Sequence, residues 1–126
     1  MILGVHHVSL LCSDLERARS FYGGILGLQE DPERPDLGYA GAWYRLGGLE
    51  LHLICLPNPC SGVLLPEHGG RDRHLALAVD ELDPLAERLE RAGVTCTRSR
   101  SGRRALFCRD PDGNALEFVE AGGQGG

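Results

Sequence analysis

The chain has 126 residues, which suits one domain, and 42% hydrophobic with 25% charged residues is the composition of an ordinary globular protein. Its formal net charge of -5 at pH 7 disfavours nucleic acids and anionic membranes as partners, because both select a basic surface. No apolar run reaches the roughly 20 residues of a membrane-spanning helix. Cys12, Cys55, Cys60, Cys96 and Cys108 form no CxxC pair, which predicts reduced thiols and a cytoplasmic location.

The first half of the chain begins with a strand and a helix. Residues 5–12 are apolar and β-branched, which predicts a strand. Ser13 followed by Glu16 matches a capping box, in which the serine is the N-cap and the glutamate bonds back from three residues on. Apolar residues at helical spacing continue until Gly27, which is suited to end a helix.

Two strands and a long loop complete this half. After a polar, proline-bearing loop, residues 42–46 and 49–56 predict strands, and Gly47 with Gly48 is a two-residue hairpin signal. Residues 57–72 are rich in proline and glycine and have no hydrophobic periodicity. We expect them to form a linker loop, and loops of this length in small domains are often functional.

The second half repeats this order of elements. Asp83 and Pro84 predict the start of a helix with proline at its first position, and Gly93 is suited to end it. Residues 110–113 read Asp-Pro-Asp-Gly and predict a tight turn, while the glycine-rich residues 121–126 predict a disordered tail. The strands predicted in this half cover residues 74–79, 94–98, 105–109 and 115–120.

The two halves also match in the spacing of four ionisable residues. Glu50 follows His7 by 43 positions, and Glu117 follows His74 by the same 43 positions. One match of this kind is readily a coincidence. Two histidine–glutamate pairs at one spacing indicate an internal repeat of a single module.

These four residues are candidates for a metal site. Alternate side chains of a strand point to opposite faces, so each half presents one histidine and one glutamate if its first and last strands lie close. Imidazole and carboxylate ligands suit Zn, Ni, Fe, Co or Mn, and four of them leave positions open for a substrate. His52 lies two positions after Glu50 and therefore on the same face, where it could replace or assist that carboxylate.

Several segments resemble glyoxalase I and its relatives in the vicinal oxygen chelate superfamily. The resemblance extends to Val119. The Pro57–Pro59 loop and residues 66–74 are similar to a glyoxalase-like subgroup of plants and bacteria. The segments that carry the resemblance are residues 7–10 (HVSL), 21–22 (FY), 26–28 (LGL), 73–80 (RHLALAVD) and 110–117 (DPDGNALE).

This resemblance implies an α+β fold in which paired βαβββ modules form a cupped, eight-stranded mixed sheet. We expect a single domain over residues 1–120, with modules at about 4–56 and 73–120 and a linker at about 57–72. Members of this superfamily are usually dimers, so the resemblance also implies a homodimer.

By the same resemblance, the four metal-ligand positions of glyoxalase I fall on His7, Glu50, His74 and Glu117. His52 is the alternative fourth ligand, since members of the subgroup carry a histidine there. Glu117 is also the implied catalytic base, which takes a proton from the carbon beside a carbonyl group.

The substrate-facing residues are predicted less directly. Arg71 and Arg73 form a basic cluster suited to a small anionic substrate. Leu11 and Ile54 stand where glyoxalase I carries polar residues that hold glutathione, which disfavours a glutathione conjugate as the substrate. The substrate-binding residues that we expect are His52, Ser9, Arg71 and Arg73.

The leading interpretation is therefore a divalent-metal-dependent, glyoxalase-like lyase or isomerase. In this superfamily the metal is a Lewis acid that stabilises an enediolate or oxyanion of a small carbonyl substrate. The alternatives are a thiol transferase of the fosfomycin-resistance type, an extradiol dioxygenase, and a metal-free drug-binding protein of the bleomycin-resistance type. Fold alone does not decide among them.

Overall fold

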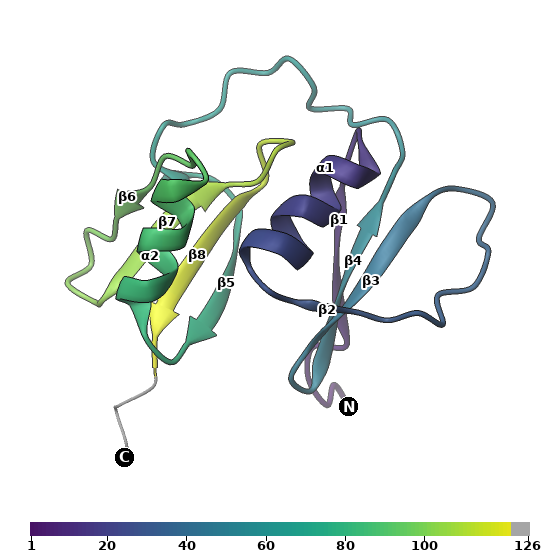
Figure 1. Ribbon diagram of the computed structural model, residues 1–126, viewed down its shortest axis with the longest axis horizontal. Coiled ribbons are helices and arrows are strands. Elements are labelled where there is room, and N and C mark those ends of the chain that lie inside the picture. Colours follow the sequence, from purple (N-terminus) through teal and green to yellow (C-terminus); the bar gives the residue numbers. More distant parts are fainter. Residues whose placement is uncertain (122–126) are drawn as a thin grey trace. The chain divides into compact units, whose positions relative to one another are not determined.

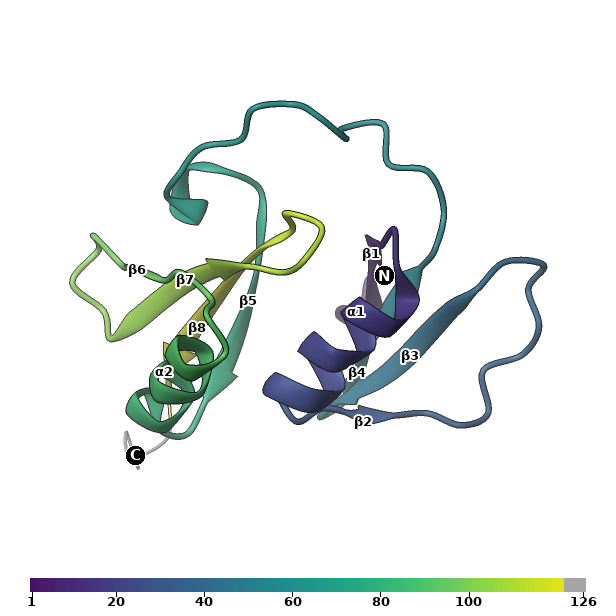
Figure 2. The ribbon, with the colours of Figure 1, turned by 45° about the horizontal axis from the view of Figure 1, so that its top comes forward.

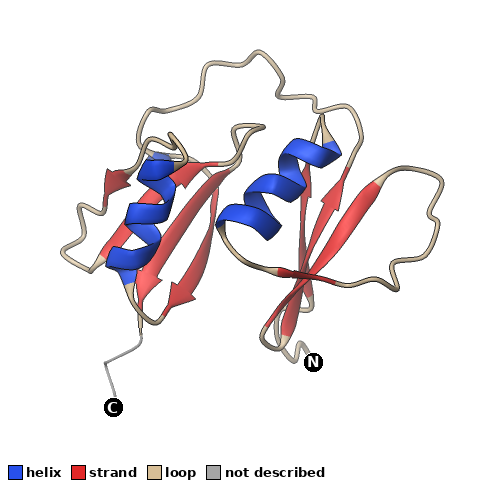
Figure 3. Ribbon diagram, in the orientation of Figure 1, coloured by secondary structure: helices blue, strands red, loops and turns tan. Residues whose placement is uncertain are grey.

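The structure is a computed structural model that describes residues 1–121. The chain divides into two compact units, Met1–Gly62 and Val63–Gly126, and the boundary falls in the segment predicted as a linker. The described part of each unit contains one four-stranded mixed sheet with a helix on it (Figure 1 and Figure 3). The predicted α+β fold of paired βαβββ modules is thereby confirmed. Apart from Ala121, the predicted disordered tail lies outside the described residues.

The first unit contains the first module, whose strands have the order β1-β4-β3-β2. The β1 strand pairs with β4 in parallel, and β3 is antiparallel to both of its neighbours. The β2 strand was not predicted, because its two residues are too few for a hydrophobic pattern. The elements are β1 (His7–Leu11), α1 (Leu15–Arg19), η1 (Ser20–Ile25), β2 (Gln29–Glu30), β3 (Gly41–Leu46) and β4 (Leu49–Ile54).

The first helix begins one residue later than the predicted capping box requires. Its N-cap is Asp14, whose side-chain oxygen accepts a hydrogen bond from the Arg17 N–H at 3.1 Å. Glu16 instead pairs with Arg19 at 2.8 Å, so the prediction that Ser13 caps the helix is wrong. After Arg19 the chain continues as the π-helix η1, and Gly27 ends it with φ +74°, as predicted.

The second unit contains the second module, whose strand order β5-β8-β7-β6 repeats that of the first. Its β5, β7 and β8 strands have the predicted bounds, whereas β6 is shorter than predicted because Val94 still bonds the end of the helix through the Leu89 carbonyl. The short helix η2 was not predicted. The elements are η2 (Gly69–Arg71), β5 (His74–Val79), α2 (Leu82–Arg91), β6 (Thr97–Arg98), β7 (Ala105–Arg109) and β8 (Ala115–Glu120).

The second helix, in contrast to the first, begins earlier than predicted. It starts at Leu82, whose N–H donates to the Glu120 carboxylate at 2.9 Å, so Pro84 is its third residue and not its first. In Figure 2 this helix lies along one face of its sheet. Leu82 and Leu89 of α2 are fully buried, as are Leu106 and Leu116 of the sheet. Because successive side chains of a strand point to opposite faces, one face of the sheet packs against α2, and the side chains of the other face are available for a functional site.

Within the described residues, no helix has the length and apolar character needed to cross a membrane.

Candidate metal centre

The strongest candidate pair lies in the second module. His74 is the first residue of β5, and Glu117 lies on the neighbouring strand β8, opposite Ala76. The His74 Nε2 atom is 3.1 Å from Glu117 Oε1. Glu117 is only 7% exposed, and burying a carboxylate is costly unless a cation or strong donor lies beside it. The predicted histidine and glutamate of this module are therefore brought together.

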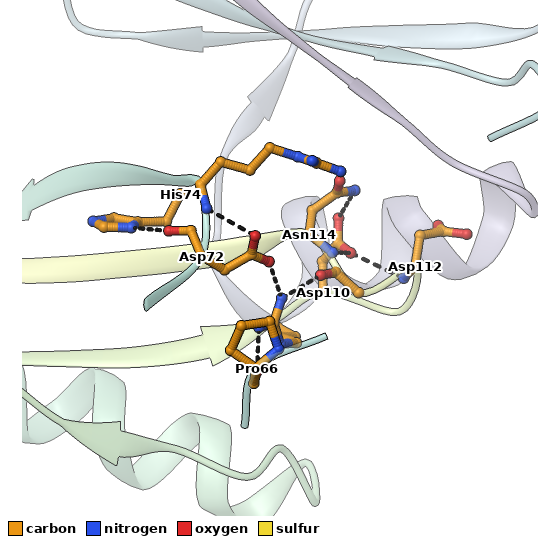
Figure 4. A network of polar contacts seen from close by, with 9 residues as sticks. Pro66, Asp72, His74, Asp110, Asp112 and Asn114 are labelled. Atoms are coloured by element: carbon orange, nitrogen blue, oxygen red, sulfur yellow. Dashed lines mark hydrogen bonds and ion pairs between the residues drawn. The ribbon is translucent and has the colours of Figure 1, made fainter. Parts of the chain in front are cut away.

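The second ring nitrogen of His74 has a fixed role. Its Nδ1 atom lies 2.8 Å from the backbone carbonyl of Asp72, as Figure 4 shows. A carbonyl oxygen can only accept, so Nδ1 carries the hydrogen and donates it. A neutral ring of this kind has its lone pair on Nε2 and can bind a metal ion there, whereas without a metal Nε2 needs a hydrogen to bond the Glu117 carboxylate, which only accepts. This is the arrangement of a metal-binding histidine whose other nitrogen is held by a carbonyl.

An aromatic ring lies beside this pair on the same face of the sheet. Phe107 of β7 is directly opposite Glu117, and Thr97 of β6 is directly opposite Phe107. The rings of His74 and Phe107 meet edge to face with centroids 5.1 Å apart. His68 meets the same phenyl ring at 4.8 Å, and its Nδ1 atom lies 2.6 Å from Thr97 Oγ1.

In the first module, His52 is at the centre of the corresponding face. Its ring is stacked on His7 at 4.2 Å and on Trp43 at 4.3 Å. Its Nε2 atom lies 2.9 Å from Glu50 Oε1. His52 is 9% exposed, whereas the Glu50 side chain is 33% exposed. All three residues predicted for this half of the site are thus in contact.

The registers of the two modules differ by two residues. In the first module His7 lies opposite Glu50, and Ser9 lies opposite His52. In the second module His74 lies opposite Ala115, so Glu117 has the place that His52 has in the first. The aromatic neighbours agree, because Trp43 is opposite His52 and Phe107 is opposite Glu117. The equal spacing of 43 residues therefore does not correspond to an equal place in the sheet.

The donor atoms fit a divalent metal. Two ligand atoms that each lie about 2.1 Å from one metal are roughly 3 to 3.4 Å apart, and the 3.1 Å between His74 Nε2 and Glu117 Oε1 falls in this range. Imidazole nitrogen with carboxylate oxygen suits Zn, Mn, Fe, Co or Ni. Across residues 1–121, no group of three or more histidine, cysteine, aspartate or glutamate side chains is gathered for a metal. We call His74 with Glu117 the half-set of the second module, and His7, Glu50 and His52 the half-set of the first.

The remaining predicted residues lie at the margin of these half-sets. Ser9 is exposed and opposite His52. Arg71, in η2, and Arg73 are both exposed, and the Arg73 N–H donates to Asp72 Oδ1 at 2.8 Å. The structure thus places Ser9 beside its half-set and places the two arginines in the segment that leads into β5.

Two residues near His74 were not predicted. Arg109 donates to Asp72 Oδ2 at 2.9 Å, and this bond lowers the pKa of the Asp72 carboxyl. Phe107 supplies the aromatic wall already described. The only sequence signal for them is their place in the predicted strand just before the 110–113 turn.

Comparison with known proteins agrees with this architecture. The model of the glyoxalase/bleomycin resistance protein/dioxygenase superfamily matches residues 4–118. Glutathione transferase FosA of Serratia marcescens is 32% identical over 94% of this chain and 81% of its own length. Lactoylglutathione lyase of Salmonella typhimurium is 30% identical over 91% of this chain and 90% of its own. A structure of the fosfomycin resistance protein FosX from Listeria monocytogenes, 20% identical, has a TM-score of 0.75 and coverage of 98% and 96%.

Proposed function

Because this chain belongs to the glyoxalase/bleomycin resistance protein/dioxygenase superfamily, we propose that it is a divalent-metal-dependent lyase or isomerase of the glyoxalase type. Its substrate is a small carbonyl compound that loses a proton from the carbon beside the carbonyl group. The observation that carries the proposal is the pair of His74 and Glu117, whose facing atoms are 3.1 Å apart around a carboxylate that is 7% exposed. A buried carboxylate beside an imidazole is suited both to bind a cation and to move a proton.

His74 and Glu117 form one half-set of the proposed metal site, and His7 with a residue of the Glu50–His52 pair forms the other. When bound, a divalent metal polarises the substrate carbonyl and stabilises negative charge on its oxygen. FosX, whose structure contains Mn(II), shows that a protein of this fold can hold such an ion. The set suits Mn, Fe, Co, Ni or Zn.

Glu117 is the proposed catalytic base. Its carboxylate lies on the aromatic-walled face of the second sheet, opposite Ala76 and beside Phe107. Ala76, its neighbour on one side, has a small side chain, and Phe107 on the other side restricts access of water. A base in such an environment takes the proton efficiently, because few water molecules compete for the carboxylate.

The first module indicates an apolar substrate group. Along the face that carries His7 and His52, the next cross-strand pair is Leu11 opposite Ile54. Neither side chain can hydrogen-bond a carboxylate, so this end of the face does not suit the charged glutathione moiety. We propose an aldehyde, ketone or oxo acid with an apolar substituent and no thiol conjugate.

A thiol transferase is the second candidate, and the 32% identity to the FosA glutathione transferase favours it. The two candidates differ in one measurable requirement. A transferase consumes thiol in proportion to product, whereas the proposed lyase or isomerase turns over without thiol.

The test begins with metal analysis of the purified protein and a screen of small carbonyl substrates with Mn, Fe(II), Co, Ni and Zn. We expect about one metal per chain and thiol-independent turnover. Glu117→Gln should lower kcat about 100- to 10,000-fold, while the exposed α2 substitution Glu90→Gln should not. Unchanged metal content in both His74→Ala and Glu117→Ala would refute the site, and strict dependence on a thiol would favour the transferase.

A further inference from the structure

Arg109 bonds three acceptors from two segments of the second module. Its Nη1 atom donates to Asp72 Oδ2 at 2.9 Å and to the Gly113 carbonyl at 2.8 Å, and its Nη2 atom donates to the Pro66 carbonyl at 2.5 Å. Figure 4 shows Pro66 and Asp72 drawn together in this network, next to the turn that carries Asp110 and Asn114. The guanidinium group thus ties the segment before β5 to the turn between β7 and β8.

Asp72, one of the three residues that Arg109 bonds, also holds a proposed metal ligand. The backbone carbonyl of Asp72 accepts the hydrogen of His74 Nδ1 at 2.8 Å, while the Asp72 side chain accepts from Arg109. The position of one residue therefore decides both contacts. If Asp72 moves, the carbonyl no longer faces Nδ1, and nothing then selects which ring nitrogen of His74 carries the hydrogen.

We propose that Arg109 is a positioning residue: by fixing Asp72, it holds the Asp72 carbonyl opposite His74 Nδ1, so that Nδ1 carries a hydrogen and Nε2 is the nitrogen left to a metal. The use of Nε2 as a metal ligand rests on the proposed function, but the hydrogen on Nδ1 does not. Arg109 acts on His74 through Asp72: its guanidinium group bonds the Asp72 side chain, and the Asp72 carbonyl bonds the ring.

The geometry requires arginine at this position. Only a guanidinium group offers several donors in one plane, and here they serve two carbonyls and a carboxylate at once. The side chains of Arg109 and Asp72 are 21% and 14% exposed, so water competes weakly for these bonds. A lysine keeps the charge but cannot reach all three acceptors from one nitrogen.

The first module has an arginine at the matching place without this arrangement. Arg45 follows Trp43 by two residues, as Arg109 follows Phe107, but its side chain is 58% exposed and lies 3.6 Å from Asp31. His7 Nδ1 lies 2.8 Å from the ring of His6, whose nitrogen can donate or accept. Within the described residues, the carbonyl-held tautomer therefore belongs to the second module.

The test measures the tautomer directly in metal-free protein. Nitrogen-15 NMR of the histidine rings, at about pH 8.5 where an imidazole is ordinarily neutral, distinguishes protonated from unprotonated Nδ1, and His74→Gln assigns the signal. We expect wild-type His74 to be protonated on Nδ1. Arg109→Gln and Arg109→Lys should both shift it toward a mixture and should weaken Zn(II) binding about 10- to 100-fold.

Arg104→Gln is the matched control. Arg104 lies just before β7 and bonds the carboxylates of Asp83 and Glu120, so its replacement also removes one positive charge and a similar number of hydrogen bonds. It should leave the His74 tautomer and Zn(II) affinity unchanged. If Arg109→Gln does not fold, Asp72→Asn serves instead, because it removes the charge that Arg109 holds while the backbone carbonyl stays.

The outcomes separate the two proposals. An unchanged His74 tautomer in folded Arg109→Lys and Asp72→Asn would overturn the positioning role. A changed tautomer in protein that binds no Zn(II) even as wild type would support the positioning role and refute the proposed metal centre.

Discussion

The imidazole rings of His7 and His52 are stacked, with their centroids 4.2 Å apart. In the strand register, His52 also has the place that Glu117 has in the second module: each lies opposite the residue two positions after the opening histidine of the neighbouring strand. We therefore predict that His52→Ala weakens metal binding by at least about 10-fold, the usual result of losing a direct ligand.

Glu50→Gln is the comparison for this prediction. Its side chain is the more exposed of the two, and it lies opposite His7 itself, where the second module has Ala115. We expect Glu50→Gln to retain the metal and to affect mainly the orientation of His52, to which it is bonded at 2.9 Å. Metal titration of both variants decides the matter: loss in Glu50→Gln with retention in His52→Ala would reverse the assignment.

Glu120 is predicted to stabilise the second module in a pH-dependent way. Its carboxylate accepts from the Leu82 N–H at 2.9 Å and from Arg104 Nε at 2.8 Å, and these bonds lower its pKa. The stabilisation is therefore present above the ordinary carboxyl pKa and is lost as the pH falls through the lowered one. Glu120→Gln should lower the melting temperature at neutral pH, and the difference from wild type should shrink in acid.

Thermal unfolding at neutral pH and at about pH 3 measures this difference. The exposed Glu87 of α2 provides a control, since Glu87→Gln changes the same charge without touching the helix start. An equal loss of melting temperature at both pH values would show that the contribution of Glu120 is not that of its charge.

Cys108 is predicted to be inert to alkylation in the folded protein. Burial raises the pKa of its thiol from 9.0 to about 12, because the thiolate would lie in the apolar core. Iodoacetamide at about pH 8.5 should leave Cys108 unlabelled while the half-buried Cys60 reacts. Mass spectrometry of tryptic peptides reads both sites, and rapid labelling of Cys108 under native conditions would contradict the core position.

The raised pKa of the Cys108 thiol also makes the free energy of unfolding depend on pH in the alkaline range. The folded-state pKa is above the unfolded one, so its contribution is complete below about pH 9 and falls as the pH rises, by up to about 1.4 kcal/mol per pH unit. Cys108→Ala should lower stability near neutral pH through the lost packing but flatten its decline in alkali. Cys60→Ala, outside the core, should change neither the level nor the slope of the curve.

We also predict a homodimer. The β1 and β5 strands each stand at the end of their own sheet, and β5 exposes His74, Ala76 and Ala78 on one face. End strands with open backbone groups and small side chains are suited to symmetric pairing with a second copy. Light scattering should give twice the 13.6 kDa mass of the chain at micromolar concentration, and a mass of a single chain there would exclude the dimer.

Much of the fold could be predicted because hydrophobic periodicity is local. The strands at 74–79, 105–109 and 115–120 have the predicted bounds, since each is rich in apolar residues and is bounded by loop or turn residues. The helix starts were displaced because capping depends on which side chain reaches the free N–H groups. For α2 that side chain belongs to Glu120, 38 residues away in the sequence.

The register within the site could not be predicted, because it depends on two loop lengths that differ between the modules and do not offset each other. The segment from His7 to Trp43 spans 36 positions against 33 from His74 to Phe107, while the later hairpin is longer in the second module. The totals from each histidine to its glutamate agree at 43. The positions of the two glutamates in their sheets do not agree, and only the strand pairing shows that His52 matches Glu117.

The alternation of β7 limits how the gene can vary in length. Leu106 and Cys108 face the buried core, while Phe107 and Arg109 serve the opposite face. Inserting or deleting one codon here would exchange the two faces, sending the guanidinium into the core and a leucine to the metal half-set. Insertions and deletions among proteins of this kind should therefore be found mainly in residues 57–65, where they would not change the register of a strand.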